Sequence, residues 1–311
     1  MMRCLIVTRV AAEFADEIDR LAGSGIPITA CHSAEDALGA YTDEKILFGN
    51  PQEIATLLPH MPTVQWVQSS WAGVTPLIDA PRRDYTLTGV KGVFGPQMSE
   101  YVLGYVLAHE LKIIERLAQQ RRRGWFRKHS GVLAGKSMGI MGTGSIGTHI
   151  ASSASALNLE TLGLSRSGIT VDGFDAAWPV AELDTFLARS HYLVSTLPAT
   201  PQTDRLLNAD TLAKLPEGAV FVNVGRSNVV DHAALVDALT TGRLAAAVLD
   251  VFEEEPLPGD SPLWEAPNLF ITAHVAAISH PLLIVPIFIE NYRRFVAGKP
   301  LKHVVDFDAG Y

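Results

Sequence analysis

A glycine-rich turn is the segment of this sequence whose spacing is best suited to binding an anionic ligand. It reads Gly142, Thr143, Gly144, Ser145, Ile146, Gly147, after a short apolar run at 137–140 and before an expected helix at 148–157. In such a turn the first glycine permits a tight bend, the second lets a pyrophosphate approach the backbone, and the third lets helix pack on strand. The helix N-terminus adds free N–H groups and the positive end of its dipole. The pattern alone also fits an ordinary tight loop, but this context favours dinucleotide binding.

Charged side chains that could act on a bound ligand stand in three later motifs. Arg226 follows a predicted strand in the motif 222–227, Glu255 lies in the acidic loop 249–256, and His274 follows another strand in the motif 272–275. In an open α/β sheet, ligands bind outside the carboxyl ends of the strands. The three motifs therefore predict a ligand site at that edge of the sheet.

Strand-like and helix-like segments alternate along almost the whole chain. Expected strands in the first hundred residues are 5–7, 26–29, 45–49, 64–68 and 85–88, with helices at 12–22, 34–41 and 51–58. A long helix is predicted from 97 to about 120, followed by strands near 138–141, 162–164, 192–196, 219–224, 245–250 and 269–272 and a last helix at 278–297. The strands are apolar throughout, which is typical of parallel strands buried on both faces.

This pattern indicates two α/β units, one inserted into the other. We expect the inserted dinucleotide-binding unit to cover residues 99–283 and the outer unit to comprise residues 1–98 and 284–311. The long helix and the last helix then connect the two units, and the segment from residue 301 returns to the first.

Composition excludes several classes of function. Hydrophobic residues make up 48% of the 311 residues, and the net charge of -8 argues against nucleic-acid binding, which needs a basic surface. The two cysteines, Cys4 and Cys31, are too few and too scattered for a disulfide framework or a zinc site and fit a reducing cytosol. We expect no metal site, no signal peptide and no membrane span.

The residues after the second strand of the inserted unit bear on cofactor choice. An NAD-preferring site usually has an acidic residue there to bind the ribose hydroxyls. This chain instead has Ser165, Arg166 and Ser167, which can bind a 2′-phosphate, although Arg166 could also be a solvated loop residue. We therefore expect a preference for NADP(H), with NAD(H) possible. Further cofactor contacts are expected from Leu197, Pro198, Val224, Gly225 and Asp250.

The three motifs, in this order, resemble those of the D-isomer-specific 2-hydroxyacid dehydrogenase family over essentially the whole chain. Three further segments are similar to its glyoxylate/hydroxypyruvate reductase branch: Gln97 to Tyr101, Ser165 to Ser167, and the ending Val305 to Tyr311. The resemblance implies a Rossmann-type dinucleotide-binding domain inserted in a flavodoxin-like α/β substrate domain.

The resemblance also implies roles for the three charged residues. His274 would donate a proton to the carbonyl oxygen of a 2-oxo acid, since imidazole titrates near neutral pH. Glu255 would orient the imidazole and favour its charged form, and Arg226 would bind the substrate carboxylate and polarise the carbonyl. The family usually has proline before the histidine, whereas this chain has Ala273, which predicts a slightly less rigid loop. Related formate dehydrogenases carry an amide where Glu255 stands, which argues against formate as substrate.

Substrate contacts are expected in the loop after the fourth strand, at Ser70, Trp71, Ala72 and Gly73. The family binds the substrate carboxylate on backbone N–H groups of this loop, and small residues suit that approach. Trp71 either narrows the pocket for short oxo acids or packs between domains. Trp125 either reaches the neighbouring active site of a dimer or caps a surface loop.

These expectations combine into a cytoplasmic NADPH-dependent reductase of a small 2-oxo acid, working as a homodimer. Two other functions fit the same residues. One is a dehydrogenase for a bulkier 2-hydroxy acid or a phosphoglycerate-type substrate, and the other is a dinucleotide-sensing regulatory protein on the same fold.

Overall fold

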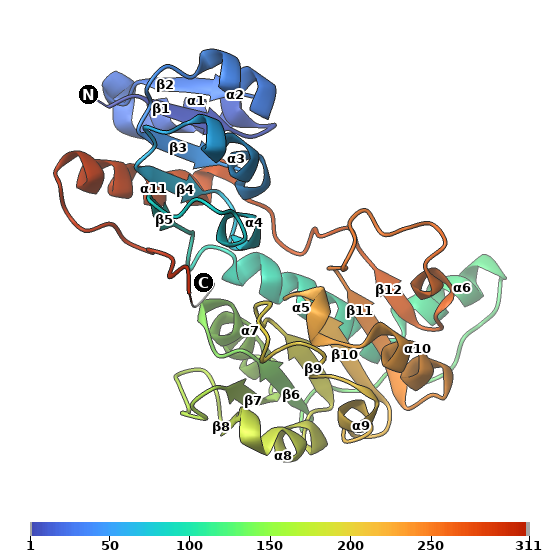
Figure 1. Cartoon of the computed structure of the whole chain (residues 1–311). Helices are drawn as coiled ribbons and strands as arrows, with labels where there is room; N and C mark the ends of the chain where they lie inside the picture. The colour runs from blue at the N-terminus through green and yellow to red at the C-terminus, as the bar shows by residue number, and fades with distance from the viewer. Residues whose placement is uncertain (1, 309–311) are drawn as a thin grey trace. The chain divides into compact units, whose positions relative to one another are not determined.

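The chain divides into two compact units, which the computed structural model describes over residues 2–308 (Figure 1). Unit 1 comprises the residues up to Val93 and those from Ser279 onward, and unit 2 runs from Phe94 to Ile278. The chain passes from unit 1 to unit 2 after Val93 and back to unit 1 after Ile278, in each case a few residues before the boundaries expected at 98/99 and 283/284. Residues 309–311 of the ending that supports the family resemblance lie outside the described part.

Unit 1 is built on a parallel five-stranded sheet with the order β2-β1-β3-β4-β5, which is the flavodoxin-like order. The strands are β1 (Cys4–Val7), β2 (Ile28–Cys31), β3 (Ile46–Gly49), β4 (Trp66–Ser69) and β5 (Thr86–Thr88). The helices are α1 (Ala11–Ala22), α2 (Ala34–Ala40), α3 (Pro51–Leu57), α4 (Thr75–Ile78) and α11 (Pro281–Val296), with short 3₁₀ turns at η1 (Gly23–Gly25) and η2 (Leu58–His60).

Helices cover both faces of this sheet. On one face α1 and α11 pack on alternate strand residues, and Phe288 of α11 stacks between Phe48 and Trp66 with ring centroids 4.6 and 5.6 Å away. On the other face α2, α3 and α4 cover Leu5, Leu47 and their neighbours. After α11 the chain returns beside β5, where Val304 bridges Thr88 in antiparallel sense and Val305 enters the core.

Unit 2 contains a parallel seven-stranded sheet with the order β12-β11-β10-β9-β6-β7-β8. The strands are β6 (Ser137–Met141), β7 (Glu160–Ser165), β8 (Ala176–Pro179), β9 (Tyr192–Ser195), β10 (Ala219–Asn223), β11 (Leu244–Leu249) and β12 (Leu269–Ile271). The helices are α5 (Gly95–Glu110), α6 (Ile113–Arg121), α7 (Ser145–Ser155), α8 (Leu183–Ala188), α9 (Ala209–Leu212) and α10 (His232–Thr240), with turns η3 (Val180–Glu182), η4 (Ser227–Val229) and η5 (Pro262–Glu265).

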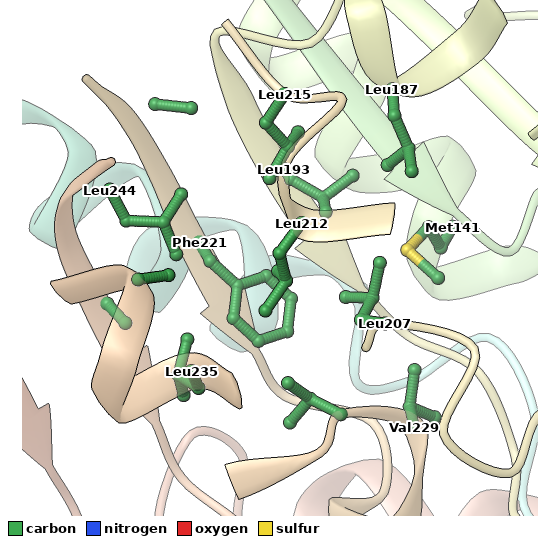
Figure 2. Packing of buried hydrophobic residues seen from close by; sticks show 14 of the residues in the cluster. Met141, Leu187, Leu193, Leu207, Leu212, Leu215, Phe221, Val229, Leu235 and Leu244 are labelled. Atoms are coloured by element: carbon green, nitrogen blue, oxygen red, sulfur yellow. The ribbon is translucent and has the colours of Figure 1, made fainter. Parts of the chain in front are cut away.

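The strand order of unit 2 reverses between β6 and β9, as in the Rossmann fold. Helices α5 and α7 cover one face through Val102, Ile150 and their neighbours. The other face is covered by α8, α9 and α10, where Phe221 of β10 lies among leucines that include Leu212 and Leu235 (Figure 2). Two parallel sheets, each with helices on both faces, confirm the expected α/β fold.

The expectation of one long helix at 97–120 was wrong. The chain forms α5 and then α6, and Lys112 between them adopts a left-handed conformation with φ of 53°. Apolar residues stand on both sides of Lys112, so the apolar pattern of the sequence continues across the break and does not reveal it. Within residues 2–308, no helix combines the length and apolar character that crossing a membrane requires.

Candidate active site in unit 2

The candidate site residues of unit 2 stand at one edge of its sheet. Because all its strands run parallel, the loops after Met141, Ser165, Ser195, Asn223 and Leu249 leave the same edge, together with the loop after β12. This is the carboxyl edge, where open α/β sheets bind ligands. The glycine turn, residues 165–167 that bear on cofactor choice, and the three charged motifs all lie in or begin these loops.

The glycine turn has the shape that its spacing predicts. Gly142 has φ of 106°, and a Cβ on Gly147 would lie 1.9 Å from the carbonyl oxygen of Gly142, so neither position accepts a side chain. A Cβ on Gly144 would meet no described atom within 4 Å. Gly144 is also the N-cap of α7, and no side chain caps that helix. The turn therefore leaves open space in front of a helix N-terminus, which fits a dinucleotide pyrophosphate.

The turn after β7 presents hydroxyl and guanidinium groups. The hydroxyl oxygen of Ser165 accepts the N–H of Gly168 at 3.1 Å, and that of Ser167 accepts the N–H of Ile169 at 3.3 Å. Each hydroxyl keeps its own proton for donation to a ligand. Arg166 is exposed between them. This edge of the sheet thus offers donors for an anionic group and no carboxylate at 165–167.

The loop after β10 is held by a residue whose role the sequence analysis missed. The buried Asn223 side chain accepts the N–H of Gly225 at 3.1 Å and donates to the carbonyl of Arg226 at 2.9 Å. Asparagine at a strand end commonly forms such a turn, which is the signal that could have identified it. A Cβ on Gly225 would lie 2.7 Å from the carbonyl oxygen of Leu197, so the loops after β9 and β10 are in close contact.

The other cofactor residues expected near this point are differently exposed. Val224 is buried, and its N–H donates to the carbonyl of Ser195 at 3.1 Å, whereas Leu197 is half-buried and Pro198 is exposed.

Arg226 is half-buried and lies in the electrostatic field of Glu255. Its Nη1 donates to the carbonyl of Gly225 at 2.7 Å. Burial lowers the pKa of the guanidinium, and the carboxylate of Glu255 acts in the opposite direction. An arginine remains charged under such a shift, so Arg226 offers a desolvated cation next to the acidic residue.

Glu255 and His274 form a direct pair. The Nδ1 atom of His274 lies 2.9 Å from Oε2 of Glu255, and Oε1 of the same carboxylate accepts the N–H of Phe252 at 2.9 Å. The side chains of His274 and Glu255 remain 45% and 38% exposed, so a ligand can reach the pair. With Nδ1 engaged, Nε2 is the ring nitrogen available for proton transfer. The structure thus brings together the three charged residues of the sequence motifs in one unit.

Asp250, expected as a cofactor contact, makes its hydrogen bonds within the chain. Its Oδ1 accepts the hydroxyl of Thr272 and the N–H of Val275, and its Oδ2 accepts the N–H of Ala276. The residue is 1% exposed. In this structure its carboxylate holds the loop that carries His274.

The expected substrate residues belong to unit 1. The Oγ of Ser69 accepts the N–H of Trp71 at 3.0 Å and donates to its carbonyl, and Ser279 donates to the carbonyl of Ser70 at 2.7 Å. Ser70 is buried, Gly73 is half-buried, and Trp71 and Ala72 are exposed. These contacts hold residues 69–71 in a tight loop at the carboxyl end of β4.

Comparison with known proteins identifies the family. A family model described as D-isomer specific 2-hydroxyacid dehydrogenase, NAD binding domain, matches residues 103–276. Glyoxylate/hydroxypyruvate reductase A of Salmonella newport (strain SL254) is 34% identical over 217 residues, which is 70% of each chain.

Two solved structures have the same fold over nearly the whole chain. A D-isomer specific 2-hydroxyacid dehydrogenase family protein of Aeromonas salmonicida subsp. salmonicida A449 is 40% identical over 99% of both chains, with a TM-score of 0.94. An NADPH-dependent glyoxylate/hydroxypyruvate reductase of Sinorhizobium meliloti, solved with NADP and sulfate, is 30% identical over 100% of both chains, with a TM-score of 0.87.

Proposed function

Because this chain belongs to the D-isomer-specific 2-hydroxyacid dehydrogenase family, a family of oxidoreductases, we propose that it reduces a small 2-oxo acid to the D-2-hydroxy acid with NADPH. Glyoxylate and hydroxypyruvate are the substrates that we favour, since a similar protein carries both names. The observation that carries the proposal is the 2.9 Å contact between His274 and Glu255 in the unit that also holds the glycine turn.

Proton transfer is the task of His274. The residues of the glycine turn would hold a nicotinamide cofactor, which would supply the hydride that the carbonyl carbon of the substrate needs. The Nε2–H of the imidazolium would donate its proton to the carbonyl oxygen, so that one hydride and one proton convert the carbonyl group to the alcohol. The carboxylate of Glu255 holds the ring through Nδ1 and balances its positive charge.

Substrate binding is the task of Arg226 and of the loop at 70–73. A guanidinium binds a carboxylate with two parallel hydrogen bonds and stabilises negative charge that develops on a neighbouring oxygen. Because Arg226 is half-buried, water screens its charge weakly, which strengthens both effects. In unit 1, the N–H groups of Ala72 and Gly73 would also bind a carboxylate, and Trp71 would limit the length of the substrate.

NADP(H) is the cofactor that the residues after β7 favour. Gly142, Thr143, Gly144, Ser145, Ile146 and Gly147 would hold the pyrophosphate, and Ser165, Arg166 and Ser167 the 2′-phosphate. The two serine hydroxyls retain protons to donate, and residues 165–167 include no carboxylate to repel a phosphate. NAD(H) remains a possible second cofactor.

A homodimer formed through unit 2 is the assembly that we propose. Helix α6 buries none of its residues, and Ile114 and Leu117 on it are each almost half exposed. Trp125, beyond α6, is 91% exposed. Such an apolar surface is typical of a subunit interface. The two free cysteines, Cys4 and Cys31, are both buried, and this use of cysteine supports a reducing compartment such as the cytoplasm.

The test is NADPH and NADH oxidation against glyoxylate, hydroxypyruvate, pyruvate and phenylpyruvate. The proposal expects the highest kcat/KM for NADPH with glyoxylate or hydroxypyruvate, and about a thousandfold loss of kcat in His274→Ala. Highest activity with phenylpyruvate would favour a dehydrogenase for bulkier acids. Turnover near zero on the whole panel would contradict the proposal and favour a dinucleotide sensor.

A further inference from the structure

The backbone of His274 has a conformation that the surrounding residues must enforce. Its φ is 55°, in the left-handed region, which residues with a Cβ seldom occupy. Such a conformation persists only where the neighbouring structure holds it in place. The preceding residue is Ala273, which restricts the backbone less than the proline usual in this family.

Asp250 provides the contacts that hold this loop. Its backbone carbonyl accepts the N–H of His274 at 2.8 Å, and its carboxylate accepts the N–H groups of Val275 and Ala276 at 2.8 and 2.9 Å. One residue therefore binds three consecutive N–H groups around the imidazole-bearing residue. Asp250 is 1% exposed, and the hydrogen bonds that its carboxylate accepts compensate its burial.

The orientation of the Asp250 carboxylate depends on a chain of hydroxyl groups. Thr272 Oγ1 lies 2.5 Å from Oδ1 of Asp250 and 2.6 Å from the hydroxyl of Tyr101. A carboxylate accepts only, so the single hydroxyl proton of Thr272 goes to Asp250. Tyr101 must then donate to Thr272. Burial raises the pKa of the Tyr101 hydroxyl, which keeps that proton in place.

Tyr101 belongs to α5, far from the other members in sequence, and its ring is held by packing. The ring centroid lies 4.9 Å from that of Tyr105, which in turn contacts Phe270 of β12. The hydroxyl at the end of this ring therefore has a fixed position relative to the carboxyl end of β12. It gives Thr272, and through it the carboxylate, one preferred orientation.

We propose that Tyr101 is a positioning residue for His274, acting through Thr272 and Asp250. The inference rests on the proposed function, since His274, the residue that Tyr101 would position, is the proton donor of that reaction. It also assigns the Asp250 carboxylate to the His274 loop instead of the cofactor, because three of its roughly four acceptor sites are already in use.

Single-turnover kinetics separates positioning from a loss of folded protein. Enzyme in excess of NADPH is mixed with saturating glyoxylate, and NADPH absorbance is followed in time. Tyr101→Phe and Thr272→Val are expected to slow the decay about tenfold at unchanged amplitude, because a displaced proton donor slows every molecule. Thr272→Ser keeps the hydroxyl and is expected to retain the rate within twofold.

The matched control is Tyr192→Phe. It also removes a tyrosine hydroxyl that donates to a buried carboxylate, that of Glu110 at 2.5 Å, but at the first residue of β9, the opposite end of the sheet. We expect its decay rate to match the wild type. A reduced amplitude at unchanged rate in Tyr101→Phe would overturn the proposal, as would an equal slowing in Tyr192→Phe.

A second measurement keeps the inference separate from the proposed reaction. Amide hydrogen exchange at residues 274–276 reports the loop whether or not any 2-oxo acid is reduced. We expect faster exchange there in Tyr101→Phe and Thr272→Val, and wild-type exchange in Thr272→Ser and Tyr192→Phe. If the wild type reduces no acid on the panel, the proposed reaction is wrong. The exchange rates at residues 274–276 then still test whether Tyr101 positions the His274 loop. Unchanged exchange in Tyr101→Phe would contradict it.

Discussion

Glu255 contacts His274 through one carboxylate oxygen, at 2.9 Å from Nδ1, while its other oxygen accepts the backbone N–H of Phe252. The carboxylate is therefore fixed at both oxygens before any ligand binds. Phe252 is itself only 8% exposed and packs in the core of unit 2, so this anchor connects the acidic loop to the interior of the unit. The imidazole is oriented by a group that has little freedom to move.

Replacing Glu255 with glutamine tests the charge of this pair. The amide keeps the size of the side chain but does not stabilise an imidazolium, so kcat should fall about a hundredfold at neutral pH. Steady-state rates with glyoxylate and NADPH measure the effect. Glu254→Gln is the matched control, because Glu254 is exposed in the same loop. Equal losses in the two variants would argue against a special role for Glu255.

Arg226→Lys tests bidentate binding of the substrate carboxylate. Lysine keeps the charge but binds as a point charge without the planar fork, so kcat/KM for glyoxylate should fall about a hundredfold while KM for NADPH changes little. Arg189→Lys, in a half-exposed pair with Glu160, should leave both constants unchanged. A parallel rise of both KM values in Arg226→Lys would point to a disturbed fold instead of a lost carboxylate contact.

Arg166→Ala tests the preference for NADP(H). Loss of the guanidinium should raise KM for NADPH about tenfold and leave KM for NADH within twofold, because the 2′-phosphate is the only difference between the two cofactors. NADH thus serves as the control within the same variant. If the wild-type KM for NADH is equal to or below that for NADPH, the preference is wrong.

Trp71→Ala tests whether this exposed ring limits substrate length. Removing it should increase kcat/KM for phenylpyruvate relative to glyoxylate, because a bulky side chain that narrows a pocket excludes the larger acid. The ratio of the two constants is the measurement. Trp264→Ala removes another half-exposed tryptophan, on η5 of unit 2, and should not change the ratio. An unchanged ratio in Trp71→Ala would assign that ring to packing.

Glu110 gives a prediction for stability against pH. Burial acts to raise the pKa of this carboxyl, but hydrogen bonds from Lys136 and Tyr192 and the charge of Lys136 lower it below the ordinary value of 4.5. A carboxyl with a lowered pKa in the folded state stabilises that state above the ordinary value and loses this contribution as the pH falls. Glu110→Gln should therefore destabilise the protein by about 2 kcal/mol at pH 7 and less at pH 4.

Urea unfolding midpoints at the two pH values check this expectation. Glu115→Gln, on the exposed helix α6, is the control and should leave the midpoint unchanged at both. A deficit in Glu110→Gln that is as large at pH 4 as at pH 7 would mean that packing, not charge, stabilises the site.

The parallel sheets and the edge that carries the motifs follow from local pattern, because apolar strands separated by helices have few other arrangements. The break at Lys112 does not, since its apolar neighbours continue the helical pattern on both sides. Beside this break, Glu110 makes long-range contacts with Lys136 and Tyr192, which no local pattern reveals. The role of Asp250 was equally hidden, because its partners Thr272, Val275 and Ala276 come more than twenty residues later.

The stack of Phe48, Phe288 and Trp66 determines the order in which the two units can complete their folding during synthesis. Phe288 belongs to α11, which leaves the exit tunnel only after all of unit 2 has been synthesised. Unit 2 is a single continuous segment and can bury both faces of its sheet as soon as it emerges. Until α11 arrives, α1 alone covers this face of the unit 1 sheet, and the rings that Phe288 contacts in the finished protein stay open to water. During this interval, the part of unit 1 that is made before unit 2 offers apolar surface to chaperones and to aggregation.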